Sequence, residues 1–252
     1  MKLAVVGLMG NKRSYPQSQV EARKRQLQRY ASKETEIDVL LPEEGTYWVD
    51  RPTEFDLIYI TPYIVKRIVE AEKEGYDACL VDCIFDPGVD EARCVVNVPV
   101  LGPGRIVLHT AGVLADKAGF FCPAGMSSHI YRFAKRFGVP DIVHYVEAVE
   151  YGPTIFGEKK QTIHDMFVEF GRRAIKSGAQ VLVPWALPLV FAGGLDAREL
   201  TKTLGIPVID PHLFVKVAED MVEMGLSHSR LAYPSPPQKQ VDFLLDSMSP
   251  HR

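Results

Sequence analysis

Cysteine is scarce in this 252-residue sequence, which contains only Cys79, Cys83, Cys94 and Cys122. No two of them form a CxxC pair, and their density is far below that of small disulfide-stabilised domains. This pattern argues against a zinc site and against a disulfide framework. We therefore expect no bound metal and a reducing, cytoplasmic location.

The sequence also lacks long apolar runs and basic clusters. No segment approaches the ~20 apolar residues that a membrane-spanning helix requires, and the apolar part of MKLAVVGLMG is too short for a signal peptide. Lys and Arg number 29 against 32 Asp and Glu, and the densest basic stretch, EARKRQLQRY, is typical of a solvated helix face. We expect neither a membrane nor a nucleic acid as partner.

Phosphate-binding glycine patterns are missing from the loop that follows the first apolar run. That loop, GLMGNKRS at residues 7–14, matches neither GxGxxG nor GxxxxGK[ST]. A nucleotide cofactor is therefore not expected.

What the sequence does contain is an alternation of short apolar runs with helical patterns. Eight runs have the length of strands: 2–8, 36–42, 56–61, 77–83, 98–103, 117–123, 180–186 and 206–210. Helical patterns occupy most of the intervals between them, with a clear apolar stripe at 161–178. Short buried strands that alternate with helices predict an α/β fold with a mainly parallel sheet.

Two stretches of the chain repeat one pattern. EGYDACLVDC runs from Gly75 through a strand to Cys83, and SGAQVLVPWA runs from Gly178 to Ala186, each over eight residues. Pro-Val-x-x-Pro follows both stretches, at 99–103 and at 207–211. The repetition predicts an internal duplication in which Cys83 and Ala186 are equivalent, beyond the carboxyl ends of parallel strands, where ligands gather.

A duplicated unit predicts two pseudo-symmetric lobes, each a mainly parallel sheet flanked by helices, with the active site in the cleft between them. We expect one lobe to comprise residues 1–103 with about 213–252, and the other to comprise residues 104–212. The tail begins with a proline-rich linker. Its segment VDFLLDSM then predicts one short helix, which docks on its own lobe or on a neighbouring subunit.

The segment EGYDACLVDCIFDPGVDEARCVVNVPVLGPG, residues 74–104, resembles the aspartate/glutamate/hydantoin racemase superfamily, and its hydantoin racemase branch in particular. SGAQVLVPWALPL and LGIPVIDPHLFVKVAE resemble the same family more weakly. The resemblance implies a two-lobed α/β enzyme that needs no cofactor, acts on a small carboxylate or a cyclic imide, and forms a homo-oligomer. It also implies two cysteines on opposite sides of an acidic carbon. The first falls on Cys83 and the second on Ala186, whose methyl group cannot carry a proton.

Cys83 is the candidate catalytic residue, and its thiolate would be the active form. A free cysteine has a pKa of about 8.5. The stretch DPGVDEAR predicts a helix N-terminus, with Asp90 as N-cap, that lowers the pKa of Cys83, whereas Asp82 and Asp86 raise it. The alternative is a buried cysteine that merely closes a strand.

Without a second cysteine, several activities stay open. A racemase or epimerase requires a substitute acid/base, for which His212 and Cys122 are the first candidates and His129 and Asp210 the next. The alternatives for the first two are a surface histidine at a helix start and a small hydrophobe. Acting alone, as an acid/base or a nucleophile, Cys83 suits a lyase, decarboxylase, cis–trans isomerase or hydrolase. A degenerate member that only binds a small carboxylate or cyclic imide is the non-enzymatic hypothesis.

Three segments are candidates for substrate binding. PAGMSSH has the composition of an anion cradle, with Ser127, Ser128 and His129, although the serines could simply cap a helix. Asn11 and Lys12, in the loop after the first strand, could contact a carboxylate in the same way. VPWALPL could form an apolar half-pocket from Trp185, Ala186, Leu187 and Leu189, or could be strand core.

Overall fold

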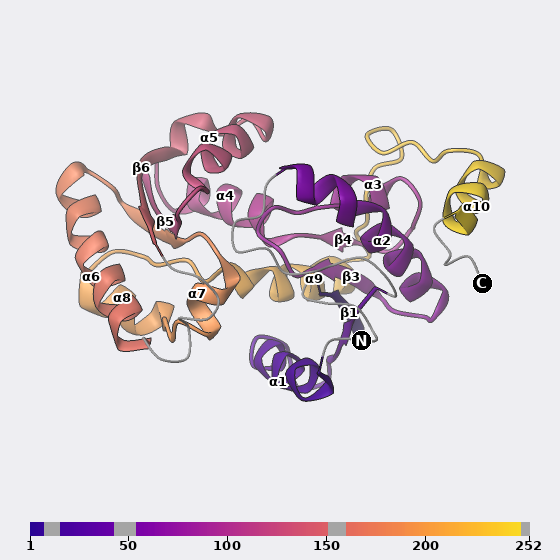
Figure 1. Ribbon diagram of the computed structural model, residues 1–252, viewed down its shortest axis with the longest axis horizontal. Helices are drawn as coiled ribbons and strands as arrows, with labels where there is room; N and C mark the ends of the chain where they lie inside the picture. Colours follow the sequence, from indigo (N-terminus) through magenta and orange to yellow (C-terminus); the bar gives the residue numbers. More distant parts are fainter. Residues whose placement is uncertain (8–15, 43–53, 151–159, 248–252) are drawn as a thin grey trace. The chain divides into compact units, whose positions relative to one another are not determined.

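The computed structural model describes residues 1–7, 16–42, 54–150 and 160–247 (Figure 1). The chain divides into two compact units. The first unit comprises Met1–Gly102 and Phe214–Arg252, and the second comprises Pro103–Leu213. The chain therefore leaves the first unit once and returns to it.

The first unit is built on a parallel sheet of four strands in the order β2-β1-β3-β4. These strands are β1 (Lys2–Val6), β2 (Glu36–Leu40), β3 (Ala78–Val81) and β4 (Val100–Leu101). All four residues of β3 are buried. Because successive side chains of a strand point to opposite faces, both faces of this sheet are covered. The covering helices are α1 (Gln17–Gln28), α2 (Glu54–Lys73), α3 (Val89–Arg93) and α9 (Phe214–Glu223).

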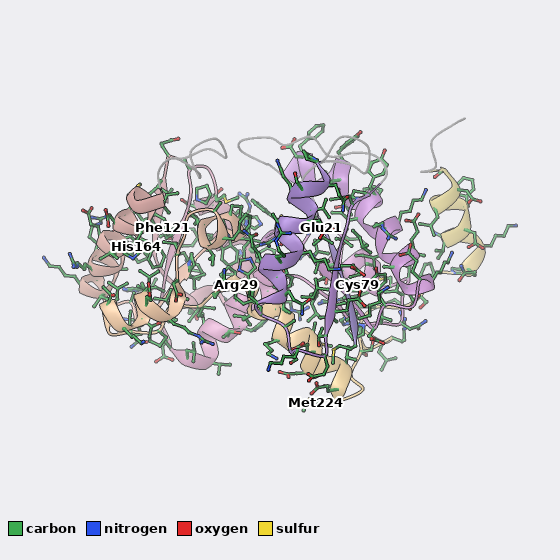
Figure 2. All side chains as sticks on the ribbon, turned by 90° about the horizontal axis from the view of Figure 1, so that it is seen from below. Glu21, Arg29, Cys79, Phe121, His164 and Met224 are labelled. Carbon is green, nitrogen blue, oxygen red and sulfur yellow. The ribbon has the colours of Figure 1, made fainter. Side chains whose placement is uncertain are left out.

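The second unit repeats this plan with a parallel sheet of three strands in the order β6-β5-β7. These strands are β5 (Ala118–Pro123), β6 (Val143–Val149) and β7 (Val181–Pro184). The helices are α4 (Pro103–Leu114), α5 (Ser127–Arg136), α6 (Lys160–Ser177), α7 (Leu187–Phe191) and α8 (Ala197–Leu204), with 3-10 turns η1 (Pro140–Ile142) and η3 (Pro211–Leu213). The rings of Phe121, Phe167 and Phe170 meet at centroid distances of 5.2–5.4 Å in its core, where Figure 2 labels Phe121.

Two groups of hydrogen bonds hold the returning chain to the first unit. In the first, Glu219 on α9 has an exposed fraction of 1% and accepts hydrogen bonds from the Ser32 N–H (2.7 Å), the Ser32 hydroxyl (3.1 Å) and Lys216 Nζ (2.6 Å). Burial opposes ionisation of this carboxyl, but the hydrogen bonds outweigh it and lower the pKa of Glu219.

The second attachment involves the segment 227–233 and the segment 93–100 that leads into β4. His228 Nε2 accepts the Val100 N–H at 2.6 Å, and Arg230 donates to the Arg93 carbonyl at 2.8 Å. The Arg93 guanidinium in turn donates to the Val100 carbonyl at 3.0 Å and to the Tyr233 hydroxyl at 2.9 Å. Helix α10 (Gln238–Ser247) then packs Leu245 against the core of this same unit, so the predicted tail helix docks on its own unit.

The predicted fold class is confirmed: the chain is α/β, with two parallel sheets flanked by helices. One predicted strand is wrong, because residues 56–61 belong to α2. In this helix Ile60, Ile64 and Ile68 are buried at intervals of four residues, which is the spacing of a helix face. Pro62 lies inside this helix and has no N–H to donate to the Ile58 carbonyl four residues earlier. Ile58 is 71% exposed, so this break falls on the solvent side of the helix.

Two other segments differ from expectation. The predicted strand 206–210 contributes a single parallel bridge, between Leu182 and Val208. Strand β6 was not predicted at all, because His144 and Glu147 interrupt its apolar run. Such interruptions are tolerated at the edge of a sheet, where β6 lies.

Candidate active site

The backbone turns sharply where β3 ends, and Cys83 lies in that turn. The Cys83 N–H donates to the Val81 carbonyl at 2.9 Å, and the Cys83 carbonyl accepts the Asp86 N–H at 3.0 Å. Asp86 has a φ of 50°, in the left-handed region. Gly102 is required beside it, because a Cβ on this residue would lie 2.2 Å from Asp86 Oδ1.

Ala186 occupies the same turn in the second unit. Its N–H donates to the Pro184 carbonyl at 2.9 Å, and its carbonyl accepts the Leu189 N–H at 3.1 Å. Ala186 thus repeats both backbone hydrogen bonds of Cys83, at the same distance from the end of its strand.

The correspondence continues along both units. Gly75 and Gly178 both have positive φ, 85° and 107°, at the ends of their helices. Matching hydrogen bonds link Cys79 N–H to the Pro99 carbonyl and Leu182 N–H to the Pro207 carbonyl, both at 2.9 Å. This agreement supports the predicted duplication and the pairing of Cys83 with Ala186. Of these two equivalent side chains, only the thiol can carry a proton.

The surroundings of Cys83 favour the protonated thiol. Burial is the main cause, with Asp86 and Asp82 adding to it and the Phe85 N–H opposing it, and together they raise the pKa of Cys83 to about 12. The predicted raising of the pKa by Asp82 and Asp86 is confirmed, and the predicted N-cap is wrong. Helix α3 has only five residues, and its N-cap is Gly88 rather than Asp90.

A buried ion pair lies directly before Cys83 in the sequence. Arg23 on α1 donates from Nε to Asp82 Oδ2 at 2.8 Å and from a terminal nitrogen to Asp82 Oδ1 at 2.5 Å. Both side chains are nearly buried, with exposed fractions of 9% and 12%. The Asp82 N–H donates to the Val6 carbonyl at 3.0 Å, so the residue is held from both its backbone and its side chain.

In the second unit, Cys122 and Ser127 lie together at the carboxyl end of β5. Cys122 Sγ is 3.8 Å from Ser127 Oγ. Burial raises the pKa of Cys122 to about 11, and the contact with Ser127 opposes this rise. Helix α5 begins at Ser127, but neither predicted serine caps it: the N-cap position is Met126, and no side chain caps the helix. Ser128 is exposed.

His129 and Trp185 belong to an aromatic cluster inside the second unit. The His129 ring is 5.0 Å from the Phe133 ring and 6.4 Å from the Trp185 ring, measured between centroids. Trp185 has no exposed surface and also contacts Phe120 at 5.5 Å. Leu187 and Leu189 are buried as well. The structure therefore places these candidates in the interior of the unit.

His212 forms a buried pair with Asp210. Its Nδ1 is 2.8 Å from Asp210 Oδ1, and its backbone N–H donates to the same oxygen at 2.9 Å. His212 has no exposed surface, so the alternative of a surface histidine is wrong. Asp210 Oδ1 can accept a ring proton from Nδ1, and in that neutral tautomer the basic lone pair lies on Nε2.

The remaining predictions concern other parts of the chain. Asn11 and Lys12 lie outside the described residues. Within residues 1–7, 16–42, 54–150 and 160–247, no group of three or more metal-ligating side chains could hold a metal ion. In the same ranges, every helix is too short or too polar to cross a bilayer.

Comparison with known proteins identifies the family of this sequence. Residues 18–214 match the sequence profile of the family described as Asp/Glu/Hydantoin racemase. The chain belongs to this family. It is 26% identical over 213 residues to the hydantoin racemase of Paenarthrobacter aurescens, with 82% of this chain and 87% of the relative covered.

Solved structures of similar fold agree with this membership. Allantoin racemase from Klebsiella pneumoniae matches with a TM-score of 0.78 at 22% identity, and 94% of each chain is covered. A liganded double mutant of arylmalonate decarboxylase matches with a TM-score of 0.61 at 13% identity, with 92% of this chain and 96% of that chain covered. At these identities the likeness establishes the fold that the racemase family shares with other enzymes.

Sequence reasoning missed Arg23. The residue lies on a helix rich in charged and polar side chains, where one more arginine does not stand out. A signal was nevertheless present, because Val20, Arg23 and Leu27 are spaced as one buried helix face. An arginine on an otherwise apolar stripe predicts a buried acidic partner.

Proposed function

We propose that the chain is a cofactor-independent racemase or epimerase that acts on a small carboxylate or a cyclic imide or amide through Cys83. The observation that carries the proposal is the turn at the end of β3, which presents a thiol at one of two duplicated positions in a member of a racemase family. The relationship to a hydantoin racemase, which covers 82% of this chain and 87% of the relative, favours a cyclic imide or amide among these substrates.

Cys83 serves as the resting proton donor in this proposal. Its pKa of about 12 keeps the thiol protonated at neutral pH. A proton donor needs a complementary base, and Ala186 cannot supply one. His212 is the proposed base, because Asp210 can hold the ring with the proton on Nδ1 and the lone pair on Nε2.

Proton transfer then balances in both directions. His212 Nε2 removes the proton from the acidic carbon of the substrate and becomes an imidazolium, leaving a carbanion stabilised by the adjacent carbonyl. The Cys83 S–H donates its proton to the carbanion and becomes a thiolate. In the reverse direction the thiolate removes the proton and the imidazolium returns one. Cys122 is the alternative second group, supported by its contact with Ser127.

A second function also has an observation in its favour. Because Ala186 occupies the turn equivalent to that of Cys83, only one of the two duplicated positions has a side chain that can deliver a proton. Protonation from one side suits a decarboxylase or another lyase, in which Cys83 delivers a proton to the carbanion left by the departing group. A cis–trans isomerase or hydrolase would instead use Cys83 as a nucleophile.

Deuterium exchange separates these functions. Optically pure 5-substituted hydantoins, allantoin, aspartate and an arylmalonate are each incubated with the protein in D2O, and NMR and polarimetry follow the reaction. A racemase incorporates deuterium at the acidic carbon while optical rotation is lost. A lyase releases a fragment, and a binding protein does neither.

Variants assign the groups. We expect Cys83→Ser and His212→Asn each to lower turnover by about 100-fold or more, the usual contribution of a general acid or base. Cys94→Ser is the matched control, since Cys94 is a partly exposed thiol of the same unit. Turnover that survives in Cys83→Ser would overturn the proposal.

A further inference from the structure

The Arg23–Asp82 pair has features that stability alone does not account for. Removing two charges from water is costly, and a buried ion pair is seldom more stable than apolar side chains of the same size. This pair is bidentate, nearly buried, and joins residues 59 positions apart, from α1 to the turn at Cys83. Figure 2 labels Glu21 and Arg29, which lie on either side of Arg23 in the sequence.

The position of Asp82 gives the pair a consequence for the thiol. A carboxylate next to a cysteine repels the thiolate and holds the proton on sulfur. Among the residues that the structure describes, the charged groups that act on Cys83 are Asp86 and Asp82, both in its own turn, and both oppose ionisation. Arg23 is the cation paired with Asp82, and its charge offsets that of the carboxylate.

We infer that Arg23 is a positioning residue for Cys83: by holding and neutralising Asp82 it allows the thiolate to form, and so lets the thiol exchange its proton during turnover. The inference rests on the proposed function only in making Cys83 the reacting thiol. Arg23 acts through Asp82, and contact with the substrate is not required of it. The fork of the guanidinium matters as well as its charge, because both carboxylate oxygens are engaged.

The test measures the thiol directly, without substrate. The rate of iodoacetamide labelling at Cys83 is followed by peptide mass spectrometry between pH 7 and 10 for the wild-type protein, Arg23→Gln, Asp82→Asn and the double variant. Arg25→Gln is the matched control, since it removes one positive charge from an exposed position of the same helix. Thermal unfolding by circular dichroism reports separately on stability.

Opposite signs are expected for the two single variants. Arg23→Gln leaves the Asp82 carboxylate unpaired and slows labelling about tenfold at each pH, which corresponds to a rise of about one unit in the pKa. Asp82→Asn removes the repulsion and speeds labelling by a similar factor. In the double variant the defect of Arg23→Gln is relieved. Arg23→Lys, which keeps the charge without the fork, falls between wild type and Arg23→Gln.

Two results would overturn the inference. One is a labelling rate in Arg23→Gln equal to that of Arg25→Gln; the other is a double variant as slow as Arg23→Gln. If Arg23→Gln does not fold, Asp82→Asn decides alone, and labelling no faster than wild type refutes the role. Loss of the proposed function is a separate outcome, recognised by turnover that persists in Cys83→Ser whatever the labelling rates show.

Discussion

Cys83 in the ligand-free protein should react far more slowly than an ordinary cysteine, and its rate should follow pH without a plateau. With a pKa of about 12, the thiolate fraction of Cys83 at pH 8 is about 1 in 10,000, against about 1 in 4 for a free cysteine of pKa about 8.5. The expected difference in alkylation rate is therefore about three orders of magnitude.

The assay is iodoacetamide labelling resolved by peptide mass spectrometry, and the perturbation is pH. Between pH 7 and pH 10 the rate at Cys83 should rise about tenfold for each pH unit, because every unit multiplies the thiolate by ten. Labelling in urea supplies the unfolded reference, in which the labelling rate levels off once pH exceeds the free-cysteine pKa of about 8.5. Cys83→Ser confirms which peptide carries the signal.

A plateau below pH 9 in the folded protein would refute the reasoning that burial dominates at this turn. Slow labelling by itself leaves the proposed enzyme standing, since the resting thiol is the proton donor. Stability offers an independent check. The folded pKa lies above the unfolded one, so the thiol's contribution to stability is complete below about pH 8.5 and is lost progressively as pH rises above it. Cys83→Ser removes this loss from the pH profile.

Two further variants test other parts of the description. Glu219→Gln should lower the free energy of unfolding by about 2 kcal/mol, because it weakens the buried carboxylate that accepts both Ser32 hydrogen bonds; thermal or urea unfolding measures this, and an unchanged midpoint would contradict the anchoring role. Ala186→Cys, added to His212→Asn, should recover turnover by about tenfold or more, because the new thiol occupies the turn that duplicates Cys83; a folded double variant without recovery would argue against that equivalence.

The duplication was predictable because it is recorded in local backbone requirements. Gly75 and Gly178 are glycines since the chain adopts positive φ there, and such a constraint is visible in the residue itself. The apolar runs of β3 and β7 are equally local, because strands buried on both faces consist of consecutive apolar residues. The same rule predicted a strand wrongly at residues 56–61, because a short apolar run fits either a strand or a helix face.

The chemistry at the candidate site was less accessible. Arg23 and Asp82 are 59 positions apart, and only the folded chain joins them. The pKa of Cys83 depends on how many atoms pack around the thiol, whereas the neighbouring sequence offered a helix N-terminus that lowers the pKa and two aspartates that raise it, and left the net direction open. Asp210, which orients His212, is only two residues away in the sequence, but the complete burial of His212 comes from distant elements.

The return of the chain to its first unit has a consequence for biosynthesis. The turn at Cys83 leads into the segment 93–100, whose carbonyl and amide groups are bound by His228 and Arg230. During synthesis those partners leave the ribosome after all of Pro103–Leu213. The second unit can therefore fold on the nascent chain before the first unit is complete. The segment that carries the thiol is synthesised early, but its contacts with the returning chain form last.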